Sequence, residues 1–327
     1  MSRLIQIAAR ATLVAGLLVT SAAVAQTPPP YPAHELRLIC PFPQNSSADV
    51  WVRFFAEQVS KQAGQPFVVE NQPGAHGNTA AEYVARAKPD GYTMLVHSPS
   101  ELAANMAMVK NTPAGLDRQL VTAATLMRYS FYLTVDANRP WRTMEEFVAY
   151  LRRKGDKARF ATSSPSTRLM GNMFKAALQL PAVEVNYRNE NQTLYDLQTN
   201  KVDYAFSDSV FAHEHWREAE LKIMGVGSRE RMQSEPEMPT LHEQGIADFD
   251  VSGFYGVMVP AGTPRPVVDK INRWVNSIVT HPQTRELIKN FAADPLSVRP
   301  DQAQRMYLDA IRDWSRLVKV TRMRPEG

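Results

Sequence analysis

Two short segments rich in serine, threonine and asparagine stand where a strand is expected to give way to a helix. The first is 41–49 and the second is 162–167. Unpaired backbone N–H groups and the positive end of the helix dipole meet at a helix N-terminus, so each segment could hold a carboxylate or a phosphate. The same residue types also serve simply as helix caps, and this second interpretation stays open for either segment alone.

If the two segments bind an anion, residues in and near them can be assigned roles. Arg168 or Arg188 would add positive charge and could pair bidentately with an acid. Phe42 and Tyr187 would pack on the carbon skeleton of the ligand. Asp49 is expected to cap its helix and order water, because like charges repel. The candidate donors of the two segments are Gln44, Asn45, Ser46, Ser47, Ser163, Ser164, Ser166 and Thr167.

Other chemistries have less support in the sequence. His213 and His215 are two residues apart on an expected helix, which places their rings on different faces and argues against zinc. An exported hydrolase using Ser163 or Ser209 is an alternative, but no activated nucleophile–base pair is visible. A Gly-x-Ser-x-Gly elbow, a P-loop and a Gly-x-Gly-x-x-Gly turn after a strand are also missing. We therefore expect no catalysis, no metal and no cofactor.

Short apolar runs alternate with helical patterns along the chain, which predicts an α/β protein of mostly parallel sheets flanked by helices. Strands are expected at 36–40, 67–69, 92–96, 131–135, 159–162, 183–187, 204–207 and 221–226, with an extended run at 251–259. Helices are expected at 50–63, 79–88, 143–153, 166–178, 266–280 and 301–320.

The repeated order predicts two lobes. Residues 31–130 and 252–327 would form lobe 1, and residues 131–251 would form lobe 2. The chain would cross between them twice, near 128–134 and 248–256, and two crossings make a hinge with a cleft beneath it. Ligands of open parallel sheets bind beyond the carboxyl ends of the strands, so the cleft is the expected site.

The N-terminus predicts export. Arg3 and Arg10 flank the opening, an apolar stretch covers 11–19, and 23–25 read Ala-Val-Ala, the small-x-small pattern of a cleavage site. The apolar stretch is too short to span a membrane. We expect a signal peptide over 1–25, a mature chain starting near Gln26, and a periplasmic location.

Composition narrows the partners. There are 37 basic and 33 acidic residues, an excess too mild to suggest nucleic acid. The single cysteine, Cys40, lies in an apolar run and is expected to be a buried small hydrophobe rather than a reactive thiol. A chain poor in cysteine with such a leader fits a bacterial periplasm better than a eukaryotic secreted domain.

Several motifs are shared with a known family. The sequence reads Glu-Asn-Gln-Pro-Gly-Ala at 70–75, Gly-Asn at 77–78, Pro-Asp-Gly-Tyr-Thr at 89–93, Met-Pro-Thr at 238–240 and Val-Pro-Ala-Gly-Thr-Pro at 259–264. In this order and spacing the chain resembles the Bug receptors, the periplasmic substrate-binding proteins of tripartite tricarboxylate transporters. The resemblance spans nearly the whole mature chain.

The resemblance implies a two-lobed Venus-flytrap fold that binds a small carboxylate and has no catalytic activity. It implies membrane permease subunits as partners, with a sensor kinase as the alternative, and we expect a monomer. The family's Pro-Tyr-Lys-Gly aligns with 186–189, and its Phe-Asp-Asn places Asp208 near the ligand. Ser98 stands where another cleft-lining loop begins, and Asp49 aligns with the acidic residue of the family's first loop.

The chain departs from the family pattern in three loops. Asn45 and Ser46 replace a glycine pair, and His76 replaces a glycine. Residues 165–168, Pro-Ser-Thr-Arg, replace a Gly-Thr-Ser-Ser-His stretch. Glycines let a carboxylate approach the bare backbone closely. In this chain we therefore expect side-chain donors to replace backbone ones.

Overall fold

The computed structural model describes residues 31–246, 249–321 and 323–325, and the side chain of Ser47 lies outside this description. The predicted signal peptide, 1–25, also lies outside it. Residues 34–327 form one compact unit. Among the described residues, no helix combines the length and the apolar character needed to cross a membrane.

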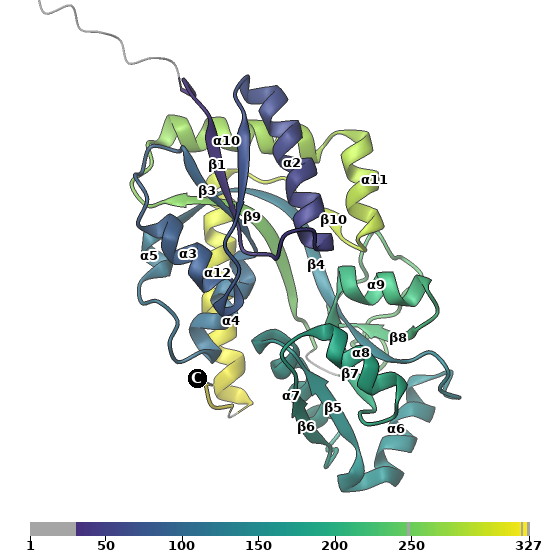
Figure 1. Ribbon diagram of the computed structural model, residues 1–327. Coiled ribbons are helices and arrows are strands. Elements are labelled where there is room, and N and C mark those ends of the chain that lie inside the picture. The colour runs from purple at the N-terminus through teal and green to yellow at the C-terminus, as the bar shows by residue number, and fades with distance from the viewer. Residues whose placement is uncertain (1–30, 247–248, 322, 326–327) are drawn as a thin grey trace, which may run out of the picture. The chain divides into compact units, whose positions relative to one another are not determined.

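The first part of this unit alternates strands and helices (Figure 1). Its elements are β1 (Leu36–Cys40), α2 (Ser47–Ala63), β2 (Phe67–Asn71), a 3-10 turn (Ala75–Gly77), α3 (Asn78–Ala85), β3 (Thr93–His97), α4 (Pro99–Met108) and α5 (Leu116–Gln119). The predicted order through β3 is confirmed, and β1 runs parallel to both β2 and β3. Helices α4 and α5 are not among the predicted elements. Most of α4 is buried, so it lacks the amphipathic pattern that identifies a surface helix.

The remaining elements follow the same alternation. They are β4 (Leu120–Asp136), α6 (Met144–Lys154), a 3-10 turn (Gly155–Lys157), β5 (Arg159–Thr162), α7 (Pro165–Ala177), β6 (Val183–Asn186), α8 (Glu190–Gln198), β7 (Tyr204–Asp208), α9 (Ser209–Arg217), β8 (Leu221–Val226), β9 (Ser252–Pro260), α10 (Arg265–Val279), α11 (Pro282–Asn290), β10 (Asp294–Pro295) and α12 (Pro300–Val320). Strand β5 runs parallel to β6 and β7.

The long strand β4 connects the two groups of parallel strands. The sheet order is β2-β1-β3-β9-β4-β7-β5-β6, with β8 and β10 also paired to β4. Leu120–Ser130 of β4 pairs antiparallel with β9, and from Phe131 onward β4 pairs antiparallel with β7 and β8. This change of partner falls where the sequence predicts the lobes to meet, although the lobe boundaries themselves stay a prediction.

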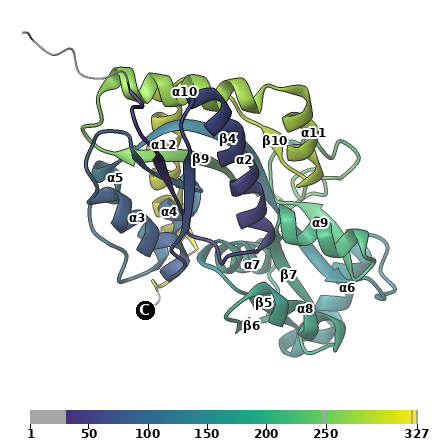
Figure 2. The same cartoon turned by 45° about the horizontal axis from the view of Figure 1, so that its top comes forward.

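The sequence predicted only 131–135 of β4. The residues before Phe131 are buried almost without interruption, so they lack the alternation that marks a half-buried strand. The helices at the end of the chain return to the first group of strands, since α10 packs on α2 and β4, and α12 packs on α4 and β4. Figures 1 and 2 both show α12 beside α4.

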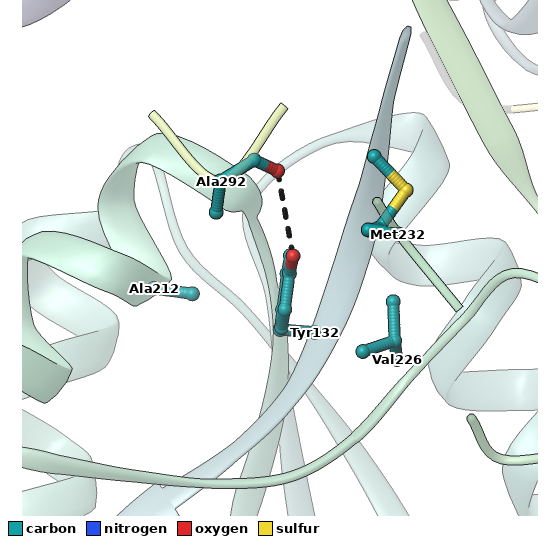
Figure 3. Close-up of a cluster of buried hydrophobic side chains, with 5 residues drawn as sticks. All are labelled: Tyr132, Ala212, Val226, Met232 and Ala292. Atoms are coloured by element: carbon teal, nitrogen blue, oxygen red, sulfur yellow. Dashed lines mark hydrogen bonds between the residues drawn. The ribbon is translucent and has the colours of Figure 1, made fainter. Parts of the chain in front are cut away.

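A small buried cluster packs against β4 and joins segments that are far apart in the sequence. Tyr132, Ala212, Val226, Met232 and Ala292 pack together there (Figure 3). The Tyr132 hydroxyl donates a hydrogen bond of 3.4 Å to the carbonyl oxygen of Ala292. The cluster ties α9 and β8 to the turn after α11, and so holds the middle of the chain against β4.

Candidate functional site

A cavity of about 350 Å³ opens between the loops that follow the strands of both groups. Its walls come from β3, α4, β4, β7, α8 and β9, from the loops that follow β1 and β5, and from the loop and 3-10 turn before α3. We call it the acidic cavity, because it is lined by three carboxyl side chains together with aromatic and small residues. Those residues are Pro41, Phe42, Pro43, Pro73, Gly74, His76, Gly77, His97, Glu101, Tyr129, Phe131, Ser163, Ser164, Asn189, Glu190, Asp208 and Tyr255.

Glu101 lies in the first turn of α4 and joins the two sides of the acidic cavity. Its Oε1 atom accepts a hydrogen bond of 2.7 Å from the Ser166 hydroxyl of α7 and a longer one of 3.4 Å from the Tyr129 hydroxyl. Burial raises the pKa of Glu101 to about 7, although these two donors oppose the shift. At neutral pH this carboxyl is therefore close to its titration midpoint.

Asp208 and Glu190 place two more carboxyl groups on the same cavity. Asp208 is the N-cap of α9, and its Oδ1 accepts from the N–H groups of Val210 at 2.8 Å and Phe211 at 3.0 Å. Burial raises the pKa of Asp208 despite these donors. Burial and the neighbouring Asp208 carboxylate raise the pKa of Glu190 well above its usual value. Like charges in a water-poor site disfavour the ionised form of both groups.

Aromatic side chains form much of the remaining wall. The ring centroids of Tyr129 and Tyr255 are 5.0 Å apart. The ring centroids of Phe42 and His97 are 6.0 Å apart, and these two rings are arranged edge to face. His97 is 5% exposed, and both of its ring nitrogens are closed off from solvent. Burial lowers the pKa of His97 to about 4, so its ring is neutral at physiological pH. The ring lies against the bare backbone of Gly77, where an added Cβ would approach Nε2 to 2.2 Å.

A second cavity of about 400 Å³ adjoins the first. It shares His76, Ser163 and Ser164 with the acidic cavity but contains two arginines, and we call it the arginine cavity. Its other lining residues are Met108, Val109, Pro165, Arg168, Asn186, Tyr187 and Arg188. Arg168 is paired with Glu184 at 2.8 Å. The guanidinium of the exposed Arg188 makes no hydrogen bond or ion pair to the described part of the chain.

The first predicted loop uses most of its donors on itself. The Asn45 N–H donates to Asp49 Oδ2 at 2.9 Å, and the Ser46 hydroxyl donates to the Pro43 carbonyl at 2.8 Å. The Asp49 N–H donates to the Ser46 hydroxyl, but the Asp49 carboxylate does not return to Ser46, so Ser46 and Asp49 form only half of a capping box. Asp49 is fully buried and binds Arg53, which fits its expected structural role. Gln44 is exposed and does not line either cavity.

The second predicted loop is also closed on itself. The N–H groups of Ser163 and Ser164 both donate to the Thr167 hydroxyl at 3.0 Å, and the Thr167 N–H donates to the Ser164 hydroxyl at 3.2 Å. Ser166 is buried and donates to Glu101. Side chains of the protein itself therefore occupy the helix N-termini that follow both loops. The backbone N–H groups named above are used in these hydrogen bonds and are not available to hold an anion.

The structure brings some of the predicted residues together and leaves others apart. Phe42, Ser163, Ser164 and Asp208 line the acidic cavity, while Ser163, Ser164, Arg168, Tyr187 and Arg188 line the arginine cavity. Ser98 is buried beneath them, where its hydroxyl shares a hydrogen bond of 2.9 Å with the Tyr129 hydroxyl. Tyr187 donates its hydroxyl to Asp196 at 2.7 Å. Ser47 begins α2, and its side chain lies outside the description.

Sequence reasoning missed Glu101, Glu190, Tyr129, Tyr255 and His97. One signal was present, because Ser98-Pro99-Ser100-Glu101 has the spacing of a capping box with proline at the first helical position. Ser98 does cap α4 by accepting from the Glu101 N–H. The Glu101 carboxyl, however, points to Ser166 of another helix, which no local spacing indicates.

The histidines and serines considered for other chemistries lie as follows. His213 pairs with Glu235 at 3.1 Å and His215 pairs with Glu220 at 2.5 Å, so the two rings have separate partners. Ser209 is buried at the start of α9. No hydrogen bond joins Ser163 or Ser209 to a histidine among the described residues. Cys40 is fully buried and free, as predicted, and burial raises its pKa to about 11.

Comparison with known proteins places this geometry in a family. The protein BugT of Bordetella pertussis is 26% identical over 320 residues, which cover 95% of this chain and 97% of BugT. The structure of the periplasmic binding protein BugD is 25% identical, with a TM-score of 0.78, and covers 90% of this chain and all of BugD. MatC from Rhodopseudomonas palustris, solved with bound malate, is 26% identical with a TM-score of 0.75, over 88% of this chain and all of MatC.

These likenesses confirm the predicted two-lobed periplasmic-binding-protein fold and the resemblance to Bug receptors. The model of the tripartite tricarboxylate transporter family receptors matches residues 51–323, which is most of the chain. Members of that family are periplasmic solute-binding receptors. This chain belongs to the tripartite tricarboxylate transporter receptor family.

Proposed function

We propose that the protein is a periplasmic receptor that captures a small carboxylate-bearing solute and delivers it to the membrane subunits of a tripartite tricarboxylate-type transporter. The observation that carries the proposal is the pair of adjoining cavities, whose walls come from both groups of parallel strands. Ligand sites of α/β folds lie at the carboxyl ends of the strands, and volumes of 300–1,000 Å³ suit small organic molecules.

Arg188 supports a carboxylate as part of the ligand. Its guanidinium has no protein partner among the described residues, and it stands beside the hydroxyls of Ser163 and Ser164 in the arginine cavity. Guanidinium groups bind carboxylates through two parallel hydrogen bonds, which gives both affinity and orientation. MatC, a relative at 26% identity, holds malate in its structure. The predicted roles of Ser163, Ser164 and Arg188 are kept in this proposal.

We also propose that the protein acts by binding alone. The family consists of receptors, and no hydrogen bond joins a histidine to Ser163, Ser164 or Ser166 among the described residues. The Glu101–Ser166 hydrogen bond connects α4 with α7 across the acidic cavity. This hydrogen bond would help to hold the two predicted lobes together around a ligand.

Titration calorimetry on the mature chain tests the proposal. Mono-, di- and tricarboxylates, with and without amino groups, are titrated into the wild type and into Arg188→Gln. We expect at least one to bind, and Arg188→Gln to weaken it at least tenfold. Arg118→Gln is the matched control, because the Arg118 side chain is 84% exposed and lies outside both cavities. The proposal is wrong if no carboxylate binds, or if the two variants behave alike.

A further inference from the structure

The acidic cavity lacks the positive charge that an anion receptor needs. Glu101, Glu190 and Asp208 line it, and no lysine or arginine is among its lining residues. Glu101 accepts from two hydroxyls, and Asp208 accepts from two backbone N–H groups. The Glu190 and Asp208 carboxyls share a hydrogen bond, and Glu190 also has a backbone hydrogen bond with Asp208. Burial and mutual repulsion favour the protonated form of these three carboxyls when the cavity is empty, and a cationic group bound among them would favour their ionised form.

The walls of this cavity suit a positively charged nitrogen. Tyr129 and Tyr255 stand 5.0 Å apart between ring centroids, and Phe42 completes the wall near His97. Aromatic faces attract ammonium and quaternary ammonium groups, and the attraction grows when the cation is desolvated. The acidic cavity therefore combines carboxyl groups and aromatic rings, both of which attract a cation.

His97 adds no positive charge to this cavity. It is 5% exposed and lines the acidic cavity. Burial lowers its pKa to about 4, against the opposing effect of a backbone hydrogen bond with His76, so its ring is neutral beside the three carboxyls.

The arginine cavity lies directly beside this site and has the opposite charge. Ser163, Ser164 and His76 line both cavities, and Arg188 lines only the arginine cavity. We propose that the ligand is a zwitterion with its charges at opposite ends, its carboxylate on Arg188 and its cationic nitrogen among Glu101, Glu190 and Asp208. An ω-amino acid has this arrangement. This inference rests on the proposed receptor function and specifies its ligand class.

Matched series of straight-chain compounds test the inference. For each length from three to eight carbons, calorimetry compares the dicarboxylate, the ω-amino acid, the α-amino acid and the diamine. At five carbons these are glutarate, 5-aminopentanoate, 2-aminopentanoate and 1,5-diaminopentane. We expect one ω-amino acid to bind at least tenfold more tightly than its dicarboxylate, its α-amino isomer and its diamine.

Two isosteric variants assign the preference to the cavity. Glu101→Gln and Glu190→Gln should each weaken the ω-amino acid at least tenfold, while leaving dicarboxylate affinity equal or higher. Glu57→Gln is the control, because Glu57 is exposed and paired with Lys61 on α2. A dicarboxylate or diamine that binds as tightly as the ω-amino acid overturns the inference, as does a preference that survives both variants. If dicarboxylates alone bind, the receptor function stands and only the inference fails. If no carboxylate of any series binds, both fail.

Discussion

Glu101→Gln is expected to stabilise the ligand-free protein at alkaline pH and to have little effect at acidic pH. The Glu101 carboxyl accepts hydrogen bonds from Ser166 and Tyr129. A glutamine amide keeps an oxygen that can accept from Ser166, and it has the same shape. The substitution therefore removes a negative charge while preserving the contact between α4 and α7.

The magnitude follows from the difference between the folded and unfolded pKa of Glu101. Burial raises this pKa from 4.5 to about 7, and the nearby Asp208 carboxylate adds to the rise. The folded protein therefore holds a proton that the unfolded chain releases between these pH values, so stability is full below pH 4.5 and falls as the pH rises to 7. At about 1.4 kcal/mol for each pH unit, the whole loss is about 3 kcal/mol, of which about 2 kcal/mol fall between pH 5 and pH 8.

Urea unfolding of the wild type and Glu101→Gln at pH 5, 6, 7 and 8 measures this difference. We expect the free energy of unfolding of the variant to exceed that of the wild type by a margin that grows by about 2 kcal/mol across this range. The control Glu57→Gln should show no growing margin, because Glu57 is exposed. A margin for Glu101→Gln that is constant with pH, or that shrinks as the pH rises, would refute the assignment of a buried, uncompensated carboxyl.

Three further substitutions test other parts of the structure. Gly77→Ala should lower the free energy of unfolding, measured in urea, by more than about 2 kcal/mol, because the φ of Gly77 is +88° and the new Cβ would clash with His97. The control Gly64→Ala should lower it by only about 1 kcal/mol, because Gly64 has a φ of +67° but open space around it. Asp203→Ala should cost about 3 kcal/mol by thermal and urea unfolding, since this buried carboxylate accepts from an ammonium, a phenol hydroxyl and a backbone N–H. A loss below about 1 kcal/mol would contradict that network. Arg188→Gln should leave unfolding within about 0.5 kcal/mol of the wild type, because the side chain is exposed, and a larger change would assign Arg188 a structural role.

Much of the fold could be predicted because its signals are local. The apolar run Leu36–Cys40 is β1 as predicted, and Gly64 ends α2 in the left-handed conformation that glycine tolerates. The elements that were not predicted are those that are buried on most sides, because their sequences show no regular alternation of apolar and polar residues. Helix α4 is buried on most sides, and the first half of β4 is buried on both faces, so neither shows the alternation on which sequence prediction depends.

The site was predicted less well because its chemistry depends on contacts between distant residues. Ser163 and Ser164 were identified from their place before a helix, and they do line both cavities. Their backbone donors, however, are taken by Thr167, four and three residues further along. Glu101 is separated from Ser166 by 65 positions, and only the folded chain brings the two together.

Two non-glycine residues hold a left-handed backbone in the loops near the cavities. Asn45 and His76, where the resemblance predicts glycine, have φ values of 64° and 54°. Asparagine tolerates this conformation better than most residues, so a loop can keep such a turn without glycine.

Two carboxyls of the acidic cavity come from the first turns of helices and not from the two predicted loops. The Asn45 N–H is taken by Asp49, while Glu101 and Glu190 stand in the first turns of α4 and α8 and reach the acidic cavity. The helix dipole favours a negative charge in a first turn. Such carboxylates therefore cost the fold less there than elsewhere in a buried site, and under our proposal they select a positive charge at that end of the ligand.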